Sequence, residues 1–337
     1  MGYILKGIEN MTYKKLFDKA TYEKVNKENL NLLQDYELEL KSNGKSVKTV
    51  YQYGADIRAF FCWIYENQDN KYILDLKKRT FRQFFLGMID NGTSPARVNR
   101  FQSSIRNLLE FASMDDDEYD YDINAMRAIK GMTNEKVREI VFLTDEQITM
   151  LIDYLVEHKE YAKAVFVSLS YDSAGRRNEV CQVEKKDFTT STQTNFVIGK
   201  RAKQFRLIYF NRTRELAKQY LKERGEDDIK ELFVTGKGDS KKAVTYDQLY
   251  NWTVSFRKIL FDLTGEEILV NPHSFRHSAL ENYNQGTHHT LEELGKDALP
   301  IEVIKVIAHH NDISTSMSYL KDHDDDLIEN ALGIKLD

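Results

Sequence analysis

The sequence contains little cysteine and very little proline. Its 337 residues include two cysteines, Cys62 and Cys181, and three prolines. Two cysteines far apart in the chain exclude a disulfide-rich scaffold, so we expect both to be buried free thiols in a reducing cytoplasm. Scarce proline, together with 12% aromatic and 41% hydrophobic residues, favours a helix-rich folded protein over a disordered one.

Long apolar runs are also missing. No stretch approaches the roughly 20 apolar residues that a membrane-spanning helix needs. The first residues, MGYILKGIENMTYKK, lack the long apolar segment and the small-residue cleavage site of a secretion signal. We therefore expect a cytoplasmic protein with no membrane partner.

The chain has no excess of positive charge either. It carries 48 lysine and arginine residues against 53 aspartate and glutamate residues, which gives a net charge of −5. Proteins that bind nucleic acids usually have a basic surface that attracts the phosphates. The composition therefore argues mildly against DNA binding, and any such surface must be a local patch.

Apolar residues recur every three or four positions through much of the first half of the chain. This spacing predicts helices, because residues three and four apart share one helical face. Breaks that contain glycine, asparagine or serine separate four such segments, which begin near Lys27, Val47, Phe81 and Pro95. An acidic run, DDDEYDYD, ends this block at Asp122.

The fourth of these segments carries three arginines on one face. Ser94 is a plausible N-cap and Pro95 suits the first helical position. Arg97, Arg100 and Arg106 follow at spacings of three and six residues, so one helical face could lie along a DNA backbone. The alternative is an ordinary solvated helix face. We treat the three arginines as candidate DNA contacts.

The second half begins with a new helical pattern. Thr144 with Gln147 forms a capping-box signature at its start. The stretch NFVIGKRAKQFRLIYF alternates apolar residues around a Gly-Lys turn, which predicts a β-hairpin. Further helices are expected at about 161–172, 211–223, 245–263, 275–285, 300–308 and 312–320.

These patterns predict a mainly α protein with a small antiparallel β-sheet, in two domains. We expect residues 1–25 to be an N-terminal extension and residues 26–131 a helical domain. Residues 132–140 are expected to be a linker, and residues 141–337 a second domain with a C-terminal tail.

Three polar stretches in the second half carry residues suited to chemistry. Each is weak alone, because paired arginines, HxxR and a helix-end tyrosine are all common. Together they supply arginines for phosphate oxygens, histidines and a lysine for proton transfer, and a tyrosine as nucleophile. Such a set suits phosphoryl transfer without a metal. The stretches are SAGRRNEVCQVEKKDF from Ser173, HSFRH from His273 and AHHNDISTSMSYL from Ala308.

In this order the stretches resemble the motifs of the tyrosine recombinases, also called phage-type integrases, over about residues 27–330. The family's first box usually reads Thr-Gly-X-Arg-X-X-Glu. Aligning Glu179 with its glutamate makes Arg176 the catalytic arginine and leaves Arg177 outside the set. Gly175 stands where the family usually has a larger residue.

The other boxes fit the same family. The second box, His-X-X-Arg-His, is intact as His273, Arg276 and His277. In the third box a histidine precedes the tyrosine by nine residues, which selects His310 and Tyr319. Three further positions bear on the resemblance. His309 replaces a usual glycine, Lys200 fits the lysine of the family's hairpin turn, and Lys203 is both the fallback for that role and a candidate DNA contact.

The resemblance implies a C-shaped clamp on double-stranded DNA, formed by a helical core-type DNA-binding domain and a catalytic domain. Tyr319 would attack the scissile phosphate and form a 3′-phosphotyrosine. Arg176, Arg276 and His310 would hold the phosphate, Lys200 would protonate the leaving 5′-oxygen, and His273 would assist proton transfer. The resemblance also implies no metal and no ATP.

The family further implies a homotetramer on DNA, with accessory proteins in some systems. The encoding genome would be that of a bacterium, a phage or a mobile element, and the protein would associate with the nucleoid. The C-terminal tail could dock on a neighbouring protomer or on its own domain.

Three other functions fit parts of the sequence. A catalytically silent recombinase fold could act as a transcriptional repressor, which the acidic charge and His309 favour. A type IB topoisomerase would share the chemistry. A zinc protein could use His273 and His277 at i, i+4, but no glutamate completes an HExxH motif and no CxxC is present.

Overall fold

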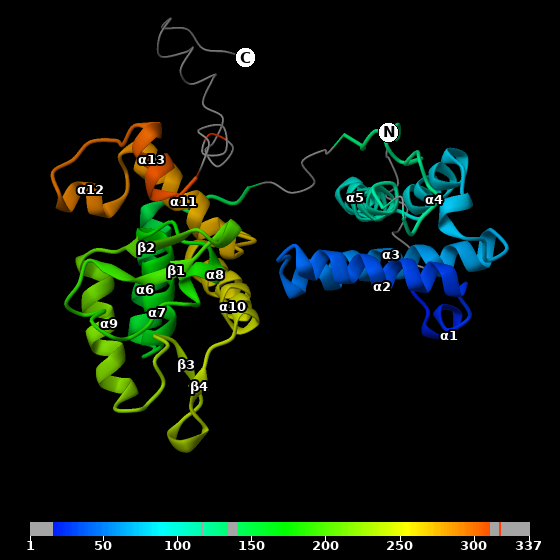
Figure 1. Cartoon of the computed structure of the whole chain (residues 1–337). Coiled ribbons are helices and arrows are strands. Elements are labelled where there is room, and N and C mark those ends of the chain that lie inside the picture. The colour runs from blue at the N-terminus through cyan, green and yellow to red at the C-terminus, as the bar shows by residue number, and fades with distance from the viewer. Residues whose placement is uncertain (1–15, 116, 134–139, 311–316, 318–337) are drawn as a thin grey trace, which may run out of the picture. The chain divides into compact units, whose positions relative to one another are not determined.

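The computed structural model describes residues 16–115, 117–133, 140–310 and 317 (Figure 1). The chain divides into two compact units, Met1–Val137 and Arg138–Asp337, and each unit has its own hydrophobic core. The expected mainly α fold with a small antiparallel sheet is confirmed. Residues 134–139, most of the expected linker, lie outside the described residues, as do residues 1–15 of the expected extension.

The first unit is built from helices that begin at capping residues. The side chains of Asn26 and Ser46 accept hydrogen bonds from the first turns of α2 and α3. Pro95 occupies the first turn of α5, as its sequence predicts. The helices are α1 (Lys19–Tyr22), α2 (Lys27–Ser42), α3 (Val47–Asn67), α4 (Lys78–Asp90) and α5 (Pro95–Ala112), with a short 3-10 helix at Ile73–Asp75.

Helix α3 forms the centre of this unit. It packs against α2 and α5 (Figure 1). Phe60, which is fully buried, contacts Phe84 with ring centroids 4.7 Å apart and Phe81 at 5.6 Å. Aromatic rings bury large areas and prefer such tilted contacts, so this cluster joins α3 to α4.

An ion pair between a buried carboxylate and a partly exposed arginine joins α3 to α5. The Asp56 carboxylate is 3% exposed and accepts hydrogen bonds from Arg100 Nε at 3.0 Å and Arg100 Nη2 at 2.8 Å. The Ser104 hydroxyl donates a further bond of 3.0 Å. Arg100 is therefore held by a bidentate bond within its own unit, because an ionised carboxylate cannot stay buried without such partners.

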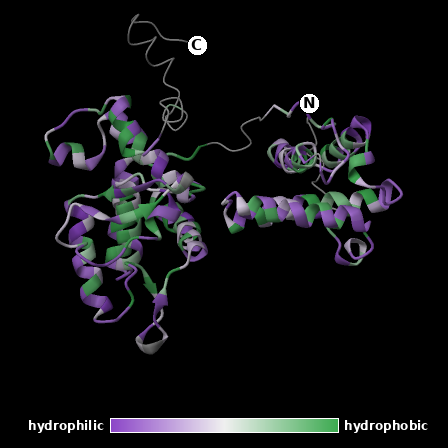
Figure 2. Cartoon of the chain, viewed as in Figure 1, coloured by the Kyte–Doolittle hydropathy of each residue, from purple (hydrophilic) through white to green (hydrophobic). Residues whose placement is uncertain are grey.

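The second unit is built around α7. Helix α7 packs against α6, α9 and α11, and its residues from Ala164 to Asp172 are all buried. Hydrophobic residues dominate α6 and α7, whereas α9 is largely hydrophilic (Figure 2). The helices are α6 (Asp145–Glu157), α7 (Tyr161–Asp172), α8 (Arg177–Val180), α9 (Asn211–Arg224), α10 (Tyr246–Thr264), α11 (Pro272–Gln285), α12 (His289–Glu293) and α13 (Ile301–Ile307).

The predicted hairpin is confirmed as β1 (Gln193–Ile198) and β2 (Gln204–Ile208), which pair antiparallel with Val197 opposite Phe205. A 3-10 helix, Lys200–Ala202, forms the turn. A second small sheet pairs β3 (Val234–Thr235) with β4 (Lys242–Ala243), next to a 3-10 helix at Gly238–Ser240. Sequence periodicity did not predict α8, α12 or this sheet, because elements of two to five residues are too short to show a period.

The capping box at Thr144 and Gln147 is also confirmed at the start of α6. The helix expected at 312–320 lies outside the described residues except for residue 317. No helix in the described part of the chain is both long and apolar enough to cross a lipid bilayer.

We predict that Arg100→Ala destabilises the first unit by about 2 kcal/mol, because it leaves a buried carboxylate with fewer donors; this lies between the values for exposed and fully buried pairs. The two tryptophans, Trp63 and Trp252, lie in different units. Urea unfolding followed by fluorescence in a Trp252→Phe background therefore reports on the first unit. The exposed Arg97→Ala is the control and should change stability by less than about 0.5 kcal/mol. Equal losses in both variants would refute the structural role of the ion pair.

Candidate active site

The buried arginine of α11 organises the candidate site. Arg276 is 1% exposed. Its Nη1 donates to the carbonyl of Ala174, and its Nη2 donates to the carbonyl of Ala308 at 2.7 Å and to His310 Nε2 at 2.6 Å. One guanidinium thus joins the segment after α7 to the end of α13. Arginine stays charged at any relevant pH, so these bonds hold a permanent cation inside the protein.

The end of α13 is shaped by a left-handed residue. His309 has φ 52°, the region that favours glycine. The His309 N–H donates to Val306 and the His310 N–H to Lys305, both at 3.0 Å, which is the Schellman pattern of a helix C-terminus. This turn places the Ala308 carbonyl and the His310 ring side by side, where both bind Arg276. The need for positive φ explains why the family that the sequence resembles usually has glycine where this chain has His309.

The end of α7 also has a left-handed residue but lacks the full Schellman pattern, because the Gly175 N–H donates to Ser173 Oγ at 3.1 Å. Ala174 has φ 48°, and its N–H donates to the Tyr171 carbonyl at 3.3 Å. Gly175 follows in a crowded position, where a Cβ would lie 2.8 Å from Ser173 Oγ and 3.0 Å from Val180 Cγ2. A larger residue at 175 would therefore require its neighbours to move.

The neighbouring arginine is oriented by the glutamate of the first box. Arg176 precedes α8, and its backbone N–H donates to Glu179 Oε2 at 2.7 Å. Its guanidinium Nη1 donates to Glu179 Oε1 at 2.9 Å. Glu179 is 1% exposed, whereas the Arg176 side chain is 25% exposed. The buried carboxylate thus fixes a cation that still reaches the surface.

Arg177 is engaged elsewhere. Its guanidinium carbon lies 3.4 Å from the ring centre of Tyr246 and 5.2 Å from that of Tyr250. Such stacking uses the face of the guanidinium against the aromatic rings of α10. The two adjacent arginines therefore have different surroundings, and the assignment of Arg176 as the phosphate ligand stays a prediction.

Both histidines at the end of α13 are held in the neutral form. Burial, followed by the positive charges of Arg276 and Arg176, lowers the pKa of His310 to about 3. Burial also lowers the pKa of His309 to about 4, and the charge of Lys203 contributes to this shift. The His309 ring stacks on Phe205 of β2 at 3.7 Å. Arginine can only donate, so His310 Nε2 accepts and Nδ1 carries the proton of the neutral ring.

His273 occupies the first turn of α11, one turn before Arg276. Its backbone N–H donates to the cap residue Asn271 at 3.0 Å. The side chain is exposed, yet desolvation by surrounding protein atoms lowers its pKa, and the charges of Arg276 and Arg176 add to this effect. His273 is therefore a neutral base near two arginines, as a proton acceptor requires.

The two hairpin lysines are both exposed. Lys200 begins the 3-10 turn between β1 and β2. Lys203 ends the turn, and its carbonyl accepts a 2.8 Å hydrogen bond from Gly199. The charge of Lys203 contributes to the lowered pKa of His309. The catalytic assignment of Lys200 stays a prediction.

The remaining predicted residues differ in their surroundings. Tyr319 lies outside the described residues. Arg97 is exposed, as a DNA contact requires. Arg100 binds Asp56, and Arg106 donates to the carbonyls of Met126 and Ile129 within its own unit. The prediction that all three arginines contact DNA is untested, but two of them have a structural role that the helical spacing did not reveal.

Backbone groups are the part of this site that sequence reasoning missed. The carbonyls of Ala174 and Ala308 carry no side-chain signal in the sequence. The His309–Phe205 contact was equally hidden, because the two residues are distant in sequence. The substituted glycine at position 309 was the one indication that the backbone there is unusual.

The chain is similar to known proteins of one family. The profile described as "Phage integrase family" matches residues 141–325. The SPbeta prophage-derived recombinase-like protein YomM of Bacillus subtilis is 25% identical over 316 residues, which cover 89% of each chain. Tyrosine recombinase XerC of Treponema denticola is 26% identical over 289 residues, or 80% of this chain and 87% of that protein.

A solved structure shares the fold. The lambda integrase tetramer bound to a Holliday junction superposes with a TM-score of 0.65 at 14% identity. The match covers 87% of this chain and 77% of that chain.

We predict that His310→Gln weakens the pH dependence of stability. In the folded protein His310 stays neutral down to about pH 3, whereas in the unfolded chain it binds a proton near its ordinary value of 6.5. The unfolded state therefore gains a proton as pH falls below about 6.5, and the stability contributed by neutral His310 is lost between pH 6.5 and 3. Each such proton changes the free energy of unfolding by up to about 1.4 kcal/mol per pH unit.

The measurement is urea unfolding between pH 8 and 4.5, followed by Trp252 fluorescence in a Trp63→Phe background. The variant should lose less stability than the parent below pH 6.5, and the two slopes should agree above pH 7.5. Parallel profiles over the whole range would contradict the buried neutral state of His310.

Proposed function

The chain belongs to the phage integrase family, and on that basis we propose that it is a site-specific DNA recombinase that cuts and rejoins DNA through a 3′-phosphotyrosine. The observation that carries this proposal is the buried Arg276 bonded to His310, with Arg176 fixed by Glu179 close by. Two arginines and a neutral imidazole N–H suit the non-bridging oxygens of a phosphodiester.

The proposed reaction proceeds by in-line displacement at phosphorus. The Tyr319 hydroxyl oxygen attacks, its proton passes to neutral His273, and the bond from phosphorus to the 5′-oxygen breaks. Lys200 gives that oxygen a proton, which leaves a free 5′-hydroxyl. The new phosphotyrosine bond retains the energy of the phosphodiester, so a 5′-hydroxyl from another strand can reverse the step and complete strand exchange.

We propose double-stranded DNA as the substrate, with the helical first unit as a second DNA-binding surface. A homotetramer on DNA is proposed because the lambda integrase structure is a tetramer on a Holliday junction. A cytoplasmic, nucleoid-associated location in a bacterium and the participation of accessory proteins follow from the same proposal.

The repressor and the type IB topoisomerase remain the contrasting functions. A repressor would have no need for the ordered arginine and histidine cluster. A topoisomerase would relax DNA that lacks any specific site, whereas a recombinase requires one.

We predict that the protein forms a covalent adduct with its own site and that Tyr319→Phe abolishes it. DNA fragments retained by the protein are recovered from the source genome, nicked near the centre of the site, incubated with each protein and resolved on a denaturing gel. After cleavage, the short fragment between the cleaved bond and the nick dissociates with its free 5′-hydroxyl. The reaction then cannot reverse, so the phosphotyrosine accumulates. Equal binding by both proteins, with an adduct from the parent alone, supports recombination. Tight binding with no adduct from either would favour the repressor.

We predict that substitutions of the adjacent Arg176 and Arg177 slow adduct formation to different extents. Arg176→Gln should slow adduct formation by about 10²–10³-fold, because it removes a charged donor to the phosphate. Arg177→Gln should slow it by less than about tenfold, because that guanidinium is stacked on Tyr246. Single-turnover rates at saturating protein measure both. A larger loss for Arg177→Gln would reverse the assignment.

A further inference from the structure

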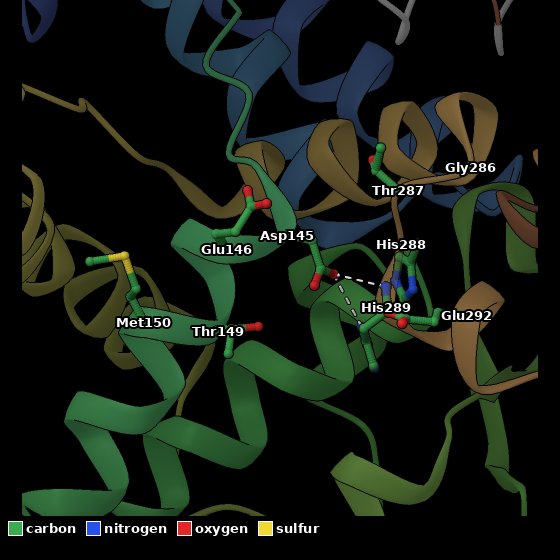
Figure 3. A pocket seen from close by; sticks show the side chains of 9 residues that line it. All are labelled: Asp145, Glu146, Thr149, Met150, Gly286, Thr287, His288, His289 and Glu292. Atoms are coloured by element: carbon green, nitrogen blue, oxygen red, sulfur yellow. Dashed lines mark hydrogen bonds and ion pairs between the residues drawn. The ribbon is translucent and has the colours of Figure 1, made fainter.

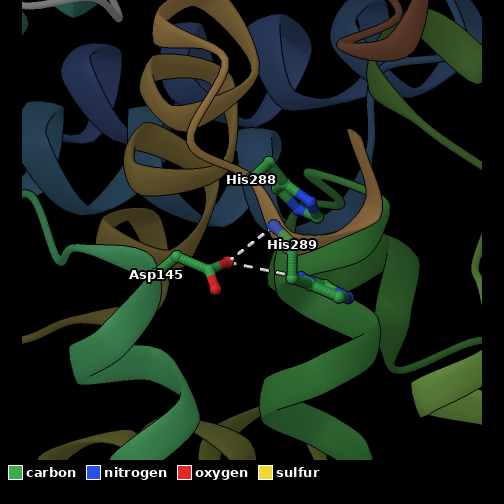
Figure 4. A group of neighbouring side chains, drawn as sticks. All are labelled: Asp145, His288 and His289. Atoms are coloured by element: carbon green, nitrogen blue, oxygen red, sulfur yellow. Dashed lines mark hydrogen bonds and ion pairs between the residues drawn. The ribbon is translucent and has the colours of Figure 1, made fainter. Parts of the chain in front are cut away.

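Three potential metal ligands meet on the second unit, apart from the arginine cluster. They are Asp145, the first residue of α6, His288, the N-cap of α12, and His289, the first residue of α12. One ligand atom of each lies within 4.8 Å of those of the other two (Figure 4). The group does not include His273 or His277, the pair that the sequence offered for zinc. Segments more than 140 residues apart thus converge on one point.

The group is open to ions from solvent. All three residues line a cavity of about 620 Å³ (Figure 3). The side chains of Asp145 and His289 are 19% and 12% exposed, and His288 is buried behind them. The site is therefore accessible but shielded, as a tight cation site requires.

His289 has a carboxylate at each ring nitrogen. Its Nδ1 lies 3.3 Å from Asp145 Oδ1, and its Nε2 lies 3.4 Å from Oδ1 of the fully buried Asp172. A neutral imidazole has one N–H. His289 Nε2 also lies 3.3 Å from Thr290 Oγ1, and Asp145 Oδ1 accepts the backbone N–H of His289 at 3.0 Å and the Tyr171 hydroxyl at 2.9 Å. If Nε2 donates to Asp172, the Nδ1 lone pair faces Asp145, and a cation between them removes the repulsion. This is the carboxylate–histidine–metal arrangement, in which the second nitrogen orients the ring.

The spacing of one ligand pair, Asp145 and His289, also fits zinc. Zinc–nitrogen and zinc–oxygen bonds of about 2.0–2.1 Å place neighbouring tetrahedral ligands about 3.3 Å apart. The Asp145–His289 separation matches this value.

His288 provides a second, independent indication. Its ring is stacked between Tyr283 at 3.9 Å and Tyr171 at 4.2 Å, so its position is fixed. Nε2 is buried without a hydrogen-bond partner among the described residues, and Nδ1 accepts a long 3.3 Å bond from Thr290. A buried polar atom without a partner costs about 1–3 kcal/mol. Because Nδ1 accepts from Thr290, Nε2 carries the proton of the neutral ring, and a metal would bind Nδ1 in place of this long bond.

We propose that Asp145, His288 and His289 bind one Zn²⁺ ion, with water as the fourth ligand and Asp172 as the hydrogen-bond acceptor of His289. Two imidazoles and one carboxylate suit zinc better than Mg²⁺ or Ca²⁺, which prefer oxygen ligands. The ion is structural. It ties the start of α6 to α12 and braces Asp172, which lies four residues before Arg176, without contacting the phosphate site.

The test uses the full-length protein freed of metal with EDTA. Calorimetric titration with ZnCl₂ should give one site per chain, and thermal unfolding should shift upward as zinc is added. Co²⁺ should give the visible absorption of a four-coordinate site without thiolate. Asp145→Asn keeps the size of the side chain and should weaken zinc binding at least about tenfold. Glu146→Gln, a carboxylate variant in the same cavity, should bind zinc like the parent.

His289→Gln is a second ligand variant and should also lose binding, which covers the case in which Asp145→Asn does not fold. Absence of zinc binding by the parent would overturn the proposal. Binding that survives Asp145→Asn and His289→Gln but is lost in His277→Asn would place the ion on α11 and would overturn it equally.

Discussion

The second unit depends on one buried guanidinium that joins two helix ends. Arg276 donates hydrogen bonds to the carbonyls of Ala174 and Ala308, which follow α7 and α13, and to the ring of His310. The C-terminal end of a helix has carbonyl groups without intrahelical partners and carries a partial negative charge. A cation there is stabilised both by hydrogen bonds to these carbonyls and by the helix dipole. Without this cation both ends would leave buried acceptors unpaired, and the His310 ring would lose its partner.

This arrangement carries a local cost in backbone strain. Ala174 and His309 adopt positive φ without being glycine, and the left-handed region disfavours other residues by roughly 1–2 kcal/mol each. The strain is offset by the hydrogen bonds to Arg276 and by the stacking of His309 on Phe205. Both strained residues adjoin the proposed phosphate ligands, where accurate placement of a charge matters more than local stability.

Several of the basic residues in this acidic protein bind partners within the fold. They are therefore not all available to bind DNA. Arg100 serves Asp56, Arg106 serves two carbonyls, and Arg224 binds Asp227 at 2.5 Å. Counting basic residues therefore says little about how many remain for DNA. The burial of each guanidinium decides this, and helical spacing alone does not reveal it.

The sequence by itself determined the features that depend on near neighbours. Capping by Thr144, the position of Pro95, the helical periods and the hairpin turn at Gly199 were all readable, because each involves residues a few positions apart. The Ser94 side chain, in contrast, makes no capping hydrogen bond. The resemblance to the family's first box, aligned on Glu179, also singled out Arg176, whose catalytic role stays a prediction. Only the tertiary structure decided which backbone carbonyls Arg276 binds, since Ala174 is 102 residues away.

The tertiary structure alone also brought Asp145 to His288 and His289, and it assigned Arg100 and Arg106 to internal bonds. The physical reason is common to all of these. Helix caps and periods are set by local backbone geometry, whereas a buried charge finds its partners only when distant helices pack together and exclude water.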